Sequence, residues 1–242
     1  MLGKIPPRGK HQGDLVNDDA LNQFNRHFSQ QNWEAAQEVV QDAIRQSPSD
    51  WNAIYLSGVI RRFQGDFHGA IALYKRALQL SGDVASIWSA LGIVYQQSRD
   101  YPSALHALSR ADELEPDNYE THTSLGITYS LAGENDAAIR SHTQAMELCV
   151  DWAFSELLRE REKYFSIKVE ADRRVFSLTP EYFTAMKETL ATDFRYFNSI
   201  KNLAACYSDI GDHQRAGELI EHADTCTPIE ADLIGPIKRS SR

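Results

Sequence analysis

The feature that most constrains the fold is a regular spacing of apolar, small and proline residues, clearest between residues 85 and 118. Each half of this stretch carries one apolar stripe at helical spacing, and residues 98–100 separate the two halves, so we predict two antiparallel helices. Gly92 lies within the first helix, where glycine costs about 1 kcal/mol against alanine. We therefore expect it to mark a close approach of the paired helices. Pro116 ends the second helix because its nitrogen cannot donate a backbone hydrogen bond.

This stretch resembles a tetratricopeptide repeat, which is a helix-turn-helix unit of about 34 residues. The residues that carry the resemblance are Trp88, Leu91, Gly92, Tyr95, Ala104, Leu108, Ala111 and Pro116, with Leu108 where an aromatic residue is usual. The resemblance implies an all-α fold, a right-handed superhelix (α-solenoid) of such repeats. Each repeat then buries its apolar face against its neighbours.

The same frame recurs before and after this stretch. Recognisable repeats are predicted at residues 17–50, 51–84, 85–118, 119–150 and 197–228. Residues 1–16 are expected to be a disordered N-terminal tail, and residues 229–242 a C-terminal cap with a basic tail.

Residues 151–196 do not fit the frame directly. We interpret them as a degenerate helical repeat with an insertion of about 12 residues, because insertions in repeats usually map to loops. The alternative is a break in the solenoid. Within the span a helix is expected over 151–169, a second helix is expected to begin at Pro180, and the structure of residues 170–178 is left open.

Composition disfavours several classes of function. The net charge of -9 argues against nucleic acid or an anionic membrane as the main partner, because phosphate binding needs clustered Lys and Arg. No apolar run approaches the roughly 20 residues of a membrane span. The N-terminus lacks the apolar segment of a secretory signal, and the three cysteines form no CxxC pair, so we expect a cytoplasmic protein with reduced thiols.

The sequence shows no motif for chemistry. None of the eight histidines lies in HExxH or pairs with cysteine at zinc-ligand spacing, and most are expected on the surface or in a groove. Nucleotide-binding loops and nucleophile elbows are also missing from the sequence. We therefore expect no metal, no cofactor and no catalytic activity. Residues of three adjacent helices could still converge on a site that spacing does not reveal.

The resemblance implies that the first helix of each repeat lines the concave side, with its second, fifth, ninth, twelfth and thirteenth residues exposed. Val59, Ile93 and Ile127 hold the ninth position in successive repeats, which predicts a groove for an apolar or amphipathic segment. The alternative is that helix packing or the N-terminal tail covers them. The candidate partner-binding residues are Tyr55, Val59, Arg62, Phe63, Ser89, Ile93, Gln97, Thr123, Ile127 and Leu131.

Chaperone-binding members of the family grip a C-terminal carboxylate with a Lys and Asn clamp. In the register of the second repeat, this chain has Tyr55 and Val59 where Lys and Asn are needed, and the first repeat does not supply the clamp either. The predicted function is thus a non-catalytic adaptor that binds a peptide or helix of a protein partner. The alternative is a self-assembling structural scaffold, in which open ends and residues 151–196 pair with further copies.

Overall fold

The computed structural model describes residues 18–158, 165–170, 173–178 and 180–225. Both predicted tails, at 1–16 and 229–242, lie outside these residues. The chain divides into two units, which we call unit 1 (Met1–Pro116) and unit 2 (Asp117–Arg242).

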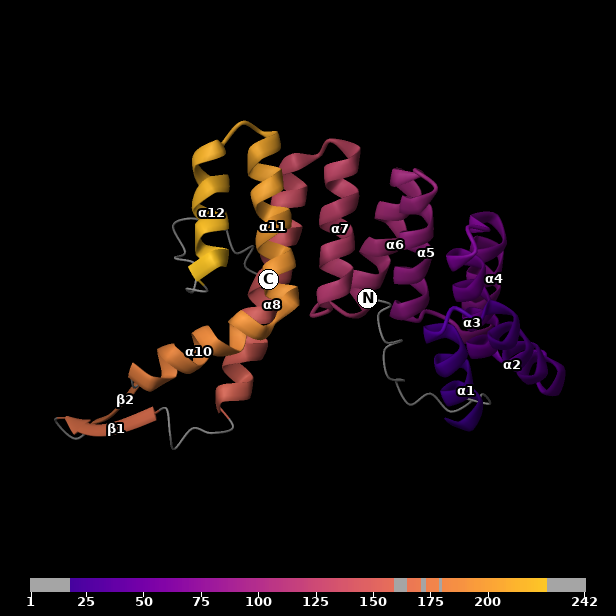
Figure 1. The fold of residues 1–242 in the computed structure, drawn as a ribbon, viewed down its shortest axis with the longest axis horizontal. Helices are drawn as coiled ribbons and strands as arrows, with labels where there is room; N and C mark the ends of the chain where they lie inside the picture. The colour runs from indigo at the N-terminus through magenta and orange to yellow at the C-terminus, as the bar shows by residue number, and fades with distance from the viewer. Residues whose placement is uncertain (1–17, 159–164, 171–172, 179, 226–242) are drawn as a thin grey trace. The chain divides into compact units, whose positions relative to one another are not determined.

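Within its described residues, unit 1 consists of three helical hairpins in succession (Figure 1). The helices of each hairpin pack against one another, and α2 packs against α3 and α4 against α5, so successive hairpins stack. The six helices are α1 (Asp18–Ser29), α2 (Trp33–Gln46), α3 (Trp51–Phe63), α4 (Phe67–Ser81), α5 (Ala85–Gln97) and α6 (Tyr101–Leu114).

The predicted repeat length is visible in the turns within the hairpins. Gln31, Gly65, Arg99 and Gly133 lie 34 residues apart, and all four have a positive φ. The residues that follow the first three turns are Asn32, Asp66 and Asp100, and each accepts a hydrogen bond from the backbone three residues on. These side chains satisfy a free N–H at the start of the second helix of each pair, which places the helix boundary at the same point of each repeat.

Close helix contact at Gly92 is confirmed. A Cβ at this position would lie 2.5 Å from Cγ of Leu108, on the partner helix of the hairpin. One repeat earlier, a Cβ at Gly58 would lie 2.5 Å from the Tyr74 ring. The glycines therefore make room for a large side chain of the second helix, which explains why a poor helix former stands in these helices.

Unit 2 contains two further hairpins of the same kind, α7 with α8 and α11 with α12, and α11 packs against α8. A β-hairpin and helix α10 lie between α8 and α11 in sequence (Figure 1). The elements are α7 (Tyr119–Ala132), α8 (Asn135–Leu158), β1 (Phe165–Glu170), β2 (Arg173–Leu178), α10 (Pro180–Thr192), α11 (Phe194–Asp209) and α12 (His213–Thr225).

The expectation of helix over 151–169 is wrong in its last part. α8 ends at Leu158, and residues 165–170 form β1, which pairs antiparallel with β2 so that Phe165 lies opposite Leu178. The reason is visible in the sequence of β1, where apolar and polar residues alternate over FSIKVE, a period that suits a strand and not a helix. The start of α10 at Pro180 is confirmed. The division of the chain into repeats and an insertion stays a prediction.

The core of unit 2 takes buried residues from α8, α10, α11 and α12, and Tyr119 of α7 packs against it. Met146 and Cys149 of α8, Leu190 of α10 and Ile200 and Leu203 of α11 are buried in one cluster. Helix α10 therefore contributes to the same core as the repeat helices, although it lies outside the repeat pattern.

Candidate functional site

Seven of the candidate residues form one face of unit 1, which we call the α3–α5 face. On α3 they follow one another at i, i+4, i+7 and i+8, and on α5 at i, i+4 and i+8, so each set shares one side of its helix. The two helices also contact each other. The α3–α5 face consists of Tyr55, Val59, Arg62, Phe63, Ser89, Ile93 and Gln97.

Exposure differs sharply along this face. Phe63 is 39% exposed and Gln97 is exposed, whereas Tyr55 and Ile93 are half-buried. Val59 is only 5% exposed and belongs to the core of unit 1. The expectation that Val59 faces solvent is therefore wrong, because helix packing covers it as the alternative interpretation proposed.

An aromatic cluster supports Phe63. Its ring lies 4.9 Å from that of Phe28 in an edge-on arrangement and 6.0 Å from that of Trp33 in a stacked one. Phe28 also stacks on Phe24, at 5.3 Å. Rings packed in this way hold Phe63 in place, so its exposed edge is a rigid apolar contact surface on α3.

Arg62 carries the positive charge of the α3–α5 face. Its guanidinium carbon lies 4.4 Å from the Phe63 ring centroid, a cation–π distance. The Nε atom is buried and has no hydrogen-bond partner among the described residues. The next arginine along the chain differs: Arg61 is exposed and pairs with Asp66 at 3.1 Å.

Two tyrosines lie near Arg62. Burial raises the pKa of Tyr55, and the positive charge of Arg62 partly opposes this effect. Burial also raises the pKa of Tyr74, again against Arg62, and its hydroxyl has no hydrogen-bond partner of good geometry among the described residues. Both phenols are therefore neutral at neutral pH and supply no counter-charge to Arg62.

The remaining three candidates lie on α7 in unit 2. Thr123 is half-buried, and Ile127 and Leu131 are 37% and 52% exposed. Ile127 and Leu131 follow Thr123 by four and eight residues, so all three share one side of α7. This apolar surface belongs to unit 2 and is considered separately from the α3–α5 face.

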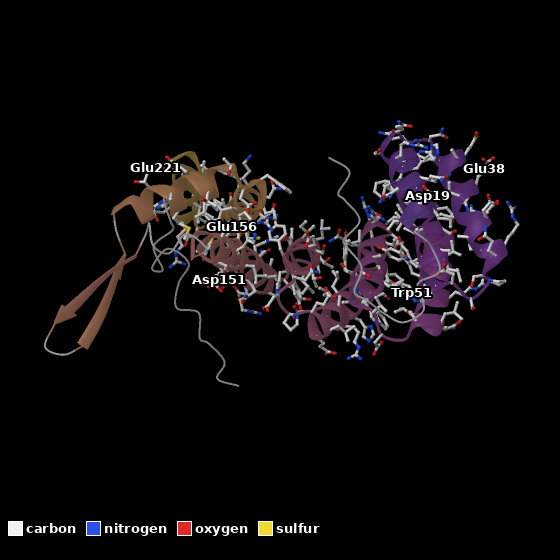
Figure 2. All side chains as sticks on the ribbon, turned by 90° about the horizontal axis from the view of Figure 1, so that it is seen from below. Asp19, Glu38, Trp51, Asp151, Glu156 and Glu221 are labelled. Carbon is white, nitrogen blue, oxygen red and sulfur yellow. The ribbon has the colours of Figure 1, made fainter. Side chains whose placement is uncertain are left out.

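Sequence reasoning missed a hollow on the first hairpin. It has a volume of about 620 Å³ between α1 and α2, with Ala20, Val39 and Ala43 among its apolar residues and Glu38 and Asp42 among its acidic ones. Figure 2 labels Glu38 on α2 and Asp19 on α1. The signal in the sequence was weak, because no spacing rule marks this surface of the first hairpin.

Sequence reasoning also missed the environment of Arg195 in unit 2. Its side chain pairs with Asp193 at 2.7 Å, and its guanidinium carbon lies 4.8 Å from the ring centroid of Trp152, which is 44% exposed. The Tyr119 hydroxyl donates a hydrogen bond to the backbone oxygen of Arg195. These contacts join α7, α8 and α11, which indicates a structural role.

Metal-ligating clusters and reactive thiols would be signs of chemistry in the described part of the chain. No set of three or more His, Cys, Asp or Glu side chains in residues 18–158 or the later described ranges could hold a metal ion. Cys149 and Cys206 are buried free thiols whose pKa values are raised by burial. Across the same described residues, no helix is both long and apolar enough to cross a membrane.

Comparison with known proteins gives sequence matches to one family. Models of the tetratricopeptide repeat match residues 21–85, 64–117 and 121–151, which together span just over half of the chain. The formate-dependent nitrite reductase complex subunit NrfG of Escherichia coli O157:H7 is 39% identical over 83 residues, or 34% of this chain. The matched part covers only 40% of that relative's length.

Solved structures of low sequence identity share the fold. MamA from Desulfovibrio magneticus RS-1 has a TM-score of 0.60 at 16% identity, covering 87% of this chain and 96% of that one. YrrB, described as a TPR protein with an unusual peptide-binding site, has a TM-score of 0.55 at 17% identity, covering 90% of this chain and 89% of that one. At these identities the likeness concerns the all-α repeat fold alone.

Proposed function

We propose that this chain, which belongs to the tetratricopeptide-repeat family, is a non-catalytic scaffold that binds a peptide or amphipathic helix of a partner protein. The observation that carries the proposal is the exposed and rigidly supported Phe63, which lies against half-buried Arg62 and shares the α3–α5 face with half-buried Ile93. Aromatic residues and arginine are the residue types that most often dominate binding energy at protein interfaces. The peptide-binding site named for YrrB supports a peptide ligand for this fold.

The apolar side of α7 gives the scaffold a second contact surface. Ile127 and Leu131 are large, exposed and on one side of their helix. We infer that they contact a partner in the same way, with Thr123 beside them. Their contribution is tested separately from that of the α3–α5 face, by variants confined to α7.

The test uses one substitution on the α3–α5 face and one control. Affinity capture with the full chain and mass spectrometry identify partners, and titration calorimetry measures binding of each purified partner. Ile93→Glu places a charge where an apolar contact is proposed, and its expected cost is about 1 to 4 kcal/mol of binding free energy. Gln79→Glu adds the same charge at an exposed position of α4 and should leave affinity unchanged.

Circular dichroism of both variants checks that the fold is kept. Undiminished affinity in folded Ile93→Glu would show that the α3–α5 face does not bind the partner. High salt should weaken wild-type binding only slightly, since apolar contacts are insensitive to salt and the charge of Arg62 is partly buried and therefore poorly screened.

Self-association is the second candidate, favoured by the hollow between α1 and α2 and by Ile220 of α12, which is 52% exposed. Apolar residues are among those that line the hollow, as a surface for another copy of the chain requires. A mass that rises with protein concentration in light scattering, and is lowered by Val39→Glu, would favour this function over the binding of a separate partner.

A further inference from the structure

Arg62 is a partly buried cation whose counter-ion does not lie among the described residues. Among the described residues it forms no ion pair, and its buried Nε has no hydrogen-bond partner. A buried donor left unpaired costs free energy, and an unpaired charge costs more. Arg61, one residue earlier, has its counter-ion in Asp66, so the difference between the two arginines is local.

The immediate surroundings of Arg62 cannot neutralise it. Its neighbours are the ring of Phe63 and the phenols of Tyr55 and Tyr74, and burial keeps both phenols protonated. The ring faces attract the cation but provide no acceptor for its N–H groups. The neutral hydroxyl of Tyr74 can accept a hydrogen bond from the guanidinium but brings no negative charge, so the positive charge of Arg62 and its other N–H donors remain for an incoming group.

We propose that the segment bound to the α3–α5 face supplies one aspartate or glutamate side chain to Arg62, with apolar residues beside it against Phe63 and Ile93. This inference rests on the proposed function and adds the chemistry of the ligand. Arginine suits a carboxylate because its planar fork can donate two parallel hydrogen bonds. The ring of Phe63 shields the pair from water, which strengthens the interaction relative to a fully exposed one.

The overall charge of the chain makes such a site selective. With a net charge of -9, the protein repels acidic peptides in general, and attraction has to come from a particular cation. Arg62 shares the α3–α5 face with the apolar side chains of Phe63 and Ile93, so a ligand must place its carboxylate in register with its own apolar side chains. A highly acidic segment without apolar residues is accordingly a poor ligand.

The test starts from peptides, because no partner has to be known. Random 12-residue peptides from a display library are selected for binding to the full chain. Those that lose binding to the Ile93→Glu variant are synthesised with amidated C-termini. Amidation removes the terminal carboxylate, so Asp and Glu side chains carry the only carboxylates of these peptides. We expect one Asp or Glu at a fixed distance from apolar residues. Replacing it by Asn or Gln should weaken binding about 10- to 100-fold.

A double-mutant cycle assigns the carboxylate to Arg62. Arg62→Gln should weaken binding of the acidic peptide by the same factor. The neutral peptide should bind Arg62→Gln and the wild-type chain with equal affinity. Arg61→Gln is the matched control on the same helix and should retain the full preference for the acidic peptide. Arg62→Lys, which keeps the charge without the fork, should restore part of it. Circular dichroism confirms the fold of each variant.

The outcomes separate this inference from the proposed function. Two results would overturn the pairing of a ligand carboxylate with Arg62. One is a set of peptides that lose binding in Ile93→Glu but share no acidic position. The other is a preference for the acidic peptide that survives in Arg62→Gln. A requirement for a free C-terminus would also overturn this pairing, since the ligand would be a terminal group. Binding that appears only after removal of residues 1–17 would show that this segment of the chain is itself the ligand of the α3–α5 face, and would overturn a partner as its source. Selected peptides that are all indifferent to Ile93→Glu would instead overturn the α3–α5 face as the binding surface.

Discussion

Acidification should destabilise unit 2 through His142. This side chain is 1% exposed and lies against Gly126, where an added Cβ would be 2.5 Å from the imidazole ring. Its Nδ1 has no hydrogen-bond partner among the described residues. Burial therefore favours the neutral ring and lowers the pKa of His142 from 6.5 to about 4.

The size of the effect follows from the two pKa values. Because the folded-state pKa is lower than the unfolded one, unfolding takes up a proton between them, and stability is complete above pH 6.5 and lost as the pH falls toward 4. Between pH 7 and pH 5 this histidine alone should lower the free energy of unfolding by about 2 kcal/mol. Such a loss is a large fraction of the stability of an ordinary domain.

Urea unfolding followed by circular dichroism at the two pH values measures this loss. His142→Leu removes the titrating group and copies the contact of Leu108 with Gly92 one repeat earlier. The variant should lose about 2 kcal/mol less than the wild-type chain on acidification, since the carboxylates are the same in both. His68→Gln removes an exposed histidine as a control. Parallel losses in the wild-type chain and His142→Leu would refute the assignment.

Two further predictions concern the stability of the repeats. Gly92→Ala should lower the free energy of unfolding by about 1 to 3 kcal/mol because its Cβ meets Leu108. Gly217→Ala, with no atom within 4 Å of the new Cβ, should raise the free energy of unfolding by up to about 1 kcal/mol. Melting temperatures of the two variants that shift in the same direction would contradict this. Asp193→Ala removes the cap of α11 and the ion pair to Arg195, at about 2 kcal/mol in chemical unfolding. Asp193→Asn keeps the cap acceptor and should cost less, so an equal cost would show that the cap does not contribute.

The repeat architecture was predictable because it depends on local patterns. Glycine at 58 and 92 predicts close packing without any knowledge of the partner side chain, and the caps at Asp66 and Asp100 follow from residue type alone. These features repeat every 34 residues, so each repeat supports the interpretation of the others. The all-α repeat fold and the close helix contact at Gly92 were accordingly predicted correctly.

The candidate site was less predictable, since exposure depends on packing in three dimensions. Val59 and Ile93 hold the same position of successive repeats, yet Val59 is buried in the core and Ile93 is half-buried. The first hairpin also contributes Phe28 and Trp33 to the surroundings of Phe63, and no spacing rule relates these residues. The missing counter-ion of Arg62 is equally invisible in sequence, because carboxylates are abundant along the chain.

In unit 2, helices α8 and α11 pack together although other elements separate them in sequence. The residues of the β-hairpin and α10 separate α8 from α11 in sequence, yet α11 packs directly against α8 as a neighbouring repeat would. Arg195 at the start of α11 contacts Trp152, which lies beyond residue 150, where the repeat pattern ends. The additional turns of α8 thus give α11 a contact that a helix of ordinary repeat length would lack. Because that contact lies outside the repeat pattern, the pattern predicts the two hairpins of unit 2 but not the side chains that join them.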